Sequence, residues 1–254
     1  MRVSAQGFWA PKLGNQDSEY EDAFYPRGQI IGQEAKLFSF AVADGATETS
    51  FSGIWAKQLV RAFCKGMSDG PAIAKELVSL REHWRKIVSR RPLPWYAEEK
   101  IRSGAFAAII GLVLEDGSDA KGQGTWKAIA VGDSCVFHVR NKQVLGCFPI
   151  KKSADFNNSP QLLSSNNPVN DGDKVRVVKR SGRWLEGDTF YLMTDAIACW
   201  FMKQVEANIV PARELAYLTD GDSNPFRLWL KDLRDHQSVR NDDVTILRIE
   251  IEKD

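Results

Sequence analysis

The sequence has little of what marks several common classes of protein. It contains only three histidines in 254 residues, far apart along the chain, and four cysteines without a Cys-x-x-Cys pair. This set matches no zinc motif and predicts reduced thiols without disulfides. The longest apolar run, Gly104 to Leu114, is shorter than the roughly 20 residues that a membrane-spanning helix needs. These absences argue against a zinc enzyme and against a membrane protein.

The sequence also lacks an excess of charge of either sign. Lysine and arginine number 34 and the acidic residues 33, which gives a formal net charge of +1. This balance argues against a nucleic-acid-binding protein, which would carry an excess of basic residues. The first residues lack the basic and then apolar pattern of a secretory signal. We therefore expect a cytoplasmic protein that binds neither nucleic acid nor a membrane.

The order of strand-like and helix-like runs predicts the fold class. Two helix-like runs follow an early strand-like run, a series of strands comes next, and a second helical group precedes a last strand. Because this is not the regular alternation of a doubly wound parallel sheet, it predicts an α+β fold of mostly antiparallel sheet with helices packed outside. The expected strands are residues 37–43, 105–114, 125–131, 135–140, 144–148, 174–178, 189–194 and 244–251, and the expected helices are 51–65, 72–90, 196–206, 212–218 and 225–234.

No linker or internal repeat divides the chain, so we expect a single domain over residues 1–254. Residues 146–170 form the least regular stretch, with clusters of proline, asparagine and serine. Two interpretations of this stretch stay open: a plain surface loop, or a loop that covers a functional site.

Aspartates repeatedly stand at the ends of apolar runs. Asp44 ends FSFAVAD, Asp133 ends WKAIAVGD, Asp195 ends TFYLMTD, and Asp242 and Asp243 stand directly before VTILRIEI. One such aspartate predicts only a turn, but several could bring their carboxylates together. Carboxylates that lie close together raise each other's pKa, and a divalent cation between them removes this cost. With so few histidines and cysteines, the pattern predicts a site for Mg²⁺ or Mn²⁺.

Five segments carry a resemblance to a known family. In order across residues 14–249 they are GNQDSEYEDAFYP, FAVADGA, AVGDSCVFHVR, FYLMTDAIACW and RNDDVTILRI. Together they resemble the successive signatures of the metal-dependent protein serine/threonine phosphatases of type 2C, in their bacterial form. The resemblance implies a four-layer α-β-β-α sandwich, in which helices flank two mostly antiparallel sheets. It also implies two Mg²⁺ or Mn²⁺ ions in a cleft at one end of the sandwich.

The resemblance further implies roles for single residues. Asp44 matches the aspartate that bridges the two metals, and Gly45 matches the glycine whose backbone carbonyl helps to hold one of them. Asp195 and Asp242 match aspartates on the other metal, and Asp243 fills the adjacent Asn-or-Asp position. Asp44, Asp195 and Asp242 are thus the candidate catalytic residues.

Further matches lie around this pair of metals. Glu21 and Asp22 match the acidic pair that binds one metal and its waters, and Asp133 matches an aspartate for a weaker third metal. Residues 15–17 are a second, less close match for the acidic signature. In the register of Glu21 and Asp22, Asp17 stands in the place of the family's phosphate-binding arginine. Lys12, or some other base, would then have to neutralise the phosphate, and Lys12 is the candidate phosphate-binding residue.

Two other positions depart from the family pattern. Ala46 stands where eukaryotic members often have a histidine proposed as general acid, so protonation of the leaving group falls to another group. Cys199 stands where many members have a further aspartate near the third metal.

The implied activity is the hydrolysis of phosphoserine or phosphothreonine in a protein substrate, with a Ser/Thr kinase as the matching partner class. No cysteine is followed by an arginine at the spacing of the cysteine-nucleophile phosphatases, and no Walker A loop is present. Two alternatives stay open. One is a small-molecule phosphatase with the same metal centre, and the other is a regulatory or binding module of the same fold with little activity.

Overall fold

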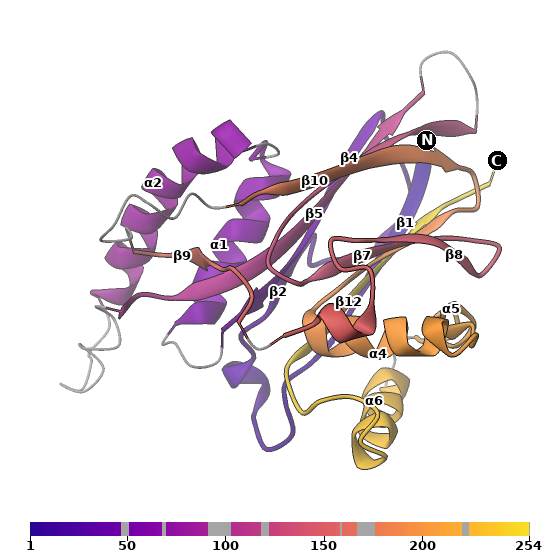
Figure 1. The fold of residues 1–254 in the computed structure, drawn as a ribbon. Helices are drawn as coiled ribbons and strands as arrows, with labels where there is room; N and C mark the ends of the chain where they lie inside the picture. The colour runs from indigo at the N-terminus through magenta and orange to yellow at the C-terminus, as the bar shows by residue number, and fades with distance from the viewer. Residues whose placement is uncertain are drawn as a thin grey trace.

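Two antiparallel sheets lie at the centre of the molecule, and helices cover their outer sides (Figure 1). The computed structural model describes residues 1–46, 51–67, 70–90, 103–117, 122–157, 159–166, 176–219 and 224–253. Helices α1 (Ser52–Cys64) and α2 (Gly70–Val88) lie beside one sheet, and α4 (Asp195–Glu206), α5 (Pro211–Leu215) and α6 (Pro225–Asp235) lie beside the other. The predicted four-layer α-β-β-α sandwich is confirmed.

The first sheet has the order β3-β1-β12-β11-β7-β8, and all its strand pairs are antiparallel. In the central strand β12, Leu247 and Ile249 pack between the sheets, whereas Val244 and Ile246 pack toward α4 and α6. Alternate side chains of a strand point to opposite faces, so a strand buried on both faces reads as a nearly continuous apolar run. The strands are β1 (Arg2–Ala10), β3 (Ile30–Glu34), β7 (Cys135–Arg140), β8 (Gln143–Phe148), β11 (Thr189–Met193) and β12 (Val244–Ile251).

The second sheet has the order β10-β6-β5-β4-β2, with β9 paired to β5. Phe40 and Val42 of its strand β4 face the other sheet, whereas Ala41 and Ala43 face the helices. These small residues let α1 pack closely on the sheet, where the Phe63 ring takes the space above Gly111. The strands are β2 (Ala23–Tyr25), β4 (Leu37–Gly45), β5 (Phe106–Asp116), β6 (Gln123–Val131), β9 (Leu163–Ser164) and β10 (Val178–Leu185).

The strand prediction differs from the structure in the bounds of β10 and in four strands that were not predicted, β1, β2, β3 and β9. The strand expected at 174–178 is β10, which begins only at Val178, and residues 174 and 175 lie outside the described residues. The sequence of β10, VKRSGRWL, is mostly exposed and polar, so it carries no apolar run. The first strand, β1, was not predicted, because Ser4, Gln6 and Gly7 interrupt the apolar positions.

The described residues also form two short 3-10 turns, at Asp17–Glu19 and Ser153–Asp155. No helix within the described residues is long and apolar enough to cross a membrane.

Candidate active site

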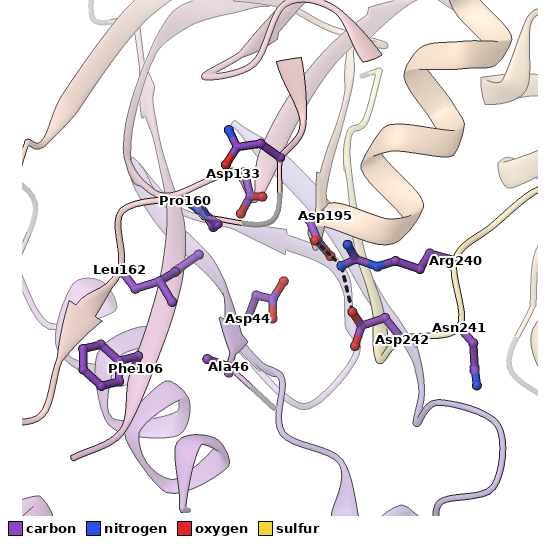
Figure 2. Close-up of a pocket in the computed structure, with 13 residues that line it drawn as sticks. Asp44, Ala46, Phe106, Asp133, Pro160, Leu162, Asp195, Arg240, Asn241 and Asp242 are labelled. Carbon is purple, nitrogen blue, oxygen red and sulfur yellow. Dashed lines mark hydrogen bonds and ion pairs between the residues drawn. The ribbon is translucent and has the colours of Figure 1, made fainter. Parts of the chain in front are cut away.

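Four of the predicted aspartates line one cavity of about 600 Å³ (Figure 2). Asp44 is the penultimate residue of β4, and Asp133 lies in the turn between β6 and β7. Asp195 begins α4 after β11, and Asp242 stands shortly before β12. These acidic side chains face an apolar side of the cavity, which consists of Ala46, Phe106, Pro160 and Leu162.

Two glycines allow the backbone to approach closely at this end of the sheets. A Cβ atom on Gly45 would lie 2.5 Å from the carbonyl oxygen of Glu21, so the end of β4 packs directly on the chain before β2. Gly132 has φ +96°, a conformation that side chains other than glycine rarely adopt. A Cβ atom there would also lie 2.5 Å from the Cβ of Ala108. The close packing at Gly45 therefore holds the backbone of Asp44 in place, and that at Gly132 holds the backbone of Asp133.

Burial of so many carboxylates makes their ionisation costly. Burial, and then the neighbouring aspartates, raises the pKa of Asp44 well above its usual value. Burial raises the pKa of Asp133 to about 7, with a further contribution from Asp195. Burial also raises the pKa of Asp195, although Arg240 opposes this shift. A cluster with these shifts is stabilised by any cation that enters it.

Asp22 lies deeper in the protein and is 1% exposed. The hydroxyl of Thr245 donates a hydrogen bond of 2.8 Å to Asp22 Oδ2. Asp22 Oδ1 is buried and has no hydrogen-bond partner among the described residues. Burial and the neighbouring Asp243 raise the pKa of this carboxyl well above its usual value. A buried carboxylate oxygen without a donor is a candidate to bind or face a cation.

Of the other predicted residues, Gly45 lines the cavity, whereas Glu21, Asp243 and Lys12 are not among its lining residues. The hydroxyl of Ser52 donates to Glu21 Oε1 at 2.5 Å. Asp243 accepts the backbone N–H groups of Lys12 at 2.9 Å and Glu21 at 2.7 Å, so its carboxylate joins the N-terminal segment to the start of β12. The Lys12 side chain, predicted to bind phosphate, is not among the cavity-lining groups of the described chain.

Arg240 lies between two of the cavity aspartates. Its Nη2 atom is 2.5 Å from Asp195 Oδ2 and 2.8 Å from Asp242 Oδ2 (Figure 2). Among the described residues that line the cavity, it is the only one with a cationic side chain. The pattern of acidic residues in the sequence does not indicate Arg240, although this residue stands only two positions before Asp242.

The donor set fits a hard divalent cation. The acidic side of the cavity offers carboxylate oxygens, which Mg²⁺ and Mn²⁺ prefer, and Asp22 adds an unpartnered buried oxygen. As placed, however, no three His, Cys, Asp or Glu side chains of the described residues converge closely enough to surround one ion. Arg240 takes the place of a cation between Asp195 and Asp242.

The irregular stretch 146–170 contributes to the site. Asn157, Pro160 and Leu162 line the cavity, which favours the interpretation of this stretch as a loop over a functional site. Residues 158 and 167–170 of the stretch lie outside the described residues. Which residues of this stretch reach the cavity could not be predicted from residue type or spacing.

Comparisons with known proteins agree with this architecture. A family model described as protein phosphatase 2C matches residues 15–242. The serine/threonine phosphatase of S. agalactiae superposes with a TM-score of 0.58 at 14% identity, over 98% of this chain and 100% of that one. The Mycobacterium tuberculosis serine/threonine phosphatase PstP/Ppp gives 0.56 at 13% identity, over 100% of both chains.

A third similar structure is the catalytic domain of PstP in complex with two manganese ions. Its TM-score is 0.55 at 13% identity, and the match covers 99% of each chain. No curated protein matches the sequence significantly. Identities this low establish a shared fold, so the activity has to be argued from the residues of the cavity.

Proposed function

The chain belongs to the protein phosphatase 2C family, and we propose that it is a metal-dependent phosphatase of phosphoserine or phosphothreonine in protein substrates. One observation carries this proposal: four carboxylates from four separate segments line a single cavity, and burial raises the pKa of three of them. This arrangement is costly without cations and suits two divalent ions.

We assign the metal-binding roles to residues as follows. Asp44 would bind both ions, and the carbonyl of Gly45 would help to hold one of them. Asp195 and Asp242 would bind the other ion, and Asp133 would serve a weaker third one. Glu21 and Asp22 would bind one ion and its waters. When bound, Mg²⁺ or Mn²⁺ would activate a water as nucleophile and neutralise phosphoryl oxygens.

The remaining groups position these ligands and shield the reaction. Asp243 holds the segment that carries Glu21 through two backbone hydrogen bonds. Phe106 and Leu162 form an apolar side of the cavity, which limits access of bulk water to the reacting phosphate. The four cysteines are poor nucleophiles, because burial raises the pKa of each thiol and keeps it protonated. These properties favour attack by water over a phosphoenzyme.

Hydrolysis of p-nitrophenyl phosphate, followed by phosphoserine and phosphothreonine peptides, tests the proposal. We expect no activity in EDTA and recovery of activity with Mn²⁺ or Mg²⁺. Asp195→Asn should abolish most of this activity, whereas Asp232→Asn, at an exposed position of α6, should leave it unchanged. Activity on p-nitrophenyl phosphate without any on phosphopeptides would favour a small-molecule phosphatase. Metal binding without hydrolysis of either would favour a regulatory module.

A further inference from the structure

Among the described residues that line the cavity, one has a cationic side chain that can attract an anion. The described lining includes four carboxylates and the single guanidinium of Arg240. Two divalent cations would balance the charge of the four carboxylates. The guanidinium would then be the remaining positive charge on the cavity wall, where a dianionic phosphoryl group has to enter.

The two positions at which the family resemblance places a phosphate-binding base do not supply one to the described cavity. Asp17 fills the position of the family's phosphate-binding arginine, and its carboxylate accepts from Arg227 Nη2 at 2.8 Å outside the cavity. Lys12 lies near the site through its backbone, which donates to Asp243, but its side chain does not line the described cavity. The base that binds phosphate therefore has to come from another part of the chain.

We propose that Arg240 is the phosphoryl-binding residue of this protein and that it holds Asp195 and Asp242 in place when no metal is bound. This inference rests on the proposed phosphatase function. A guanidinium is planar and offers paired N–H donors, which match two oxygens of a phosphate. The side chain of Arg240 is 51% exposed, so it can turn from the carboxylates to an entering phosphate without a change in the core.

Removal of the positive charge of Arg240 should change the affinities for phosphate and for Mn²⁺ in opposite directions. Without the guanidinium, phosphate loses a charge-assisted partner and should bind more weakly. The same loss removes a cation that competes with metal for Asp195 and Asp242, so Mn²⁺ should bind more tightly. General damage to the site would weaken both equilibria together, which makes the opposite signs diagnostic.

Calorimetry on five proteins tests this proposal: the wild type, Arg240→Gln, Arg240→Lys, Lys12→Gln and the control Arg227→Gln. Mn²⁺ is titrated into each metal-free protein, and inorganic phosphate is then titrated into each Mn²⁺-loaded protein. In Arg240→Gln we expect phosphate to bind about 10- to 100-fold more weakly, the KM for p-nitrophenyl phosphate to rise, and Mn²⁺ to bind several-fold more tightly. Arg240→Lys should recover part of the phosphate affinity, because it keeps the charge but loses the paired donors.

Arg227→Gln is the matched control, since it removes an arginine that is paired outside the cavity and should leave both affinities unchanged. The proposal is overturned if Arg240→Gln binds phosphate as the wild type does, or if Lys12→Gln alone loses phosphate affinity. It is also overturned if Arg240→Gln folds normally but binds Mn²⁺ more weakly. If the wild type hydrolyses substrate with Mn²⁺ in these cases, the proposed function stands without this inference. A wild type that binds no Mn²⁺ would overturn both.

Discussion

Thr245 and Asp22 are joined by a buried hydrogen bond of 2.8 Å although they stand 223 positions apart in the chain. Thr245 also bonds the hydroxyl of Tyr20, and its backbone N–H donates to Thr194 Oγ1 at 3.0 Å. A single hydroxyl on β12 therefore bonds two side chains of the segment before β2. Its position explains how the N-terminal acidic segment is held against the C-terminal strand.

Thr245→Val should destabilise the protein. The substitution keeps the side-chain shape but removes the hydrogen-bond partner of Asp22 Oδ2 and of the Tyr20 hydroxyl. We expect the free energy of unfolding to fall by about 1–3 kcal/mol, the cost of unsatisfied buried polar groups. Urea unfolding of the metal-free protein measures this loss, and Thr245→Ser, which keeps the hydroxyl, is the control. Equal stability of Thr245→Val and the wild type would show that this hydrogen bond contributes little.

Much of the fold was predictable because the residues that are buried on both faces of a sheet form apolar runs. Strands such as β5 and β12 were predicted for this reason, and the aspartates at strand ends followed from them. β10 lacks this signal because most of its side chains are exposed. The first strand, β1, lacks it because small and polar residues stand between its apolar positions.

The acidic residues of the candidate site could be predicted from the sequence, but the positions of their side chains could not. Asp242 and Asp243 are adjacent and chemically equal, yet only Asp242 lines the cavity, while Asp243 accepts two backbone N–H groups. Arg240 was missed because its role depends on the position of Asp195, far away in the sequence. The direction in which a side chain points is a tertiary property, and neither residue type nor spacing determined it here.

Cys199→Ala should keep most of the phosphatase activity. Burial raises the pKa of this thiol, so it carries little of the nucleophilic thiolate at neutral pH. It lines a neighbouring cavity of about 290 Å³, which shares Asp195 and Arg240 with the main one. Steady-state kinetics on p-nitrophenyl phosphate should give a kcat close to that of the wild type. A folded Cys199→Ala protein with kcat reduced by several orders of magnitude would point to a covalent mechanism.

Asp188 should contribute stability that is lost in acid. It is fully buried and accepts from Arg140 Nε at 2.6 Å and His138 Nε2 at 2.7 Å. Burial alone would raise its pKa, but these hydrogen bonds lower it to about 2. Because the unfolded value is about 3.9, the contribution is complete above about pH 4 and disappears as the pH falls toward 2.

Asp188→Asn removes the charge of this buried group and tests that contribution. At pH 7 we expect a loss of about 3 kcal/mol, as for a buried ion pair with one partner removed. Between pH 4 and 2, the stability of the variant should fall less steeply than that of the wild type. Urea unfolding at several pH values gives both quantities, and parallel curves for the two proteins would contradict the assignment.

Asp44 and Asp133 should differ in their importance for turnover. Asp44 is assigned to both core metals, so Asp44→Asn should reduce kcat by roughly a thousandfold or more, equivalent to about 4 kcal/mol of lost transition-state stabilisation. Asp133 is assigned to a weaker third metal, so Asp133→Asn should reduce kcat less. Steady-state kinetics at saturating Mn²⁺ compares the two variants. A larger loss in Asp133→Asn would reverse their assigned roles.

The central claim is that the carboxylate cavity holds two divalent cations through Asp44, and calorimetric titration of Mn²⁺ tests it most directly. The wild type and Asp133→Asn should each bind two ions tightly, whereas Asp44→Asn should lose tight binding of both. Two tightly bound ions in a folded Asp44→Asn protein, or none in the wild type, would contradict the account.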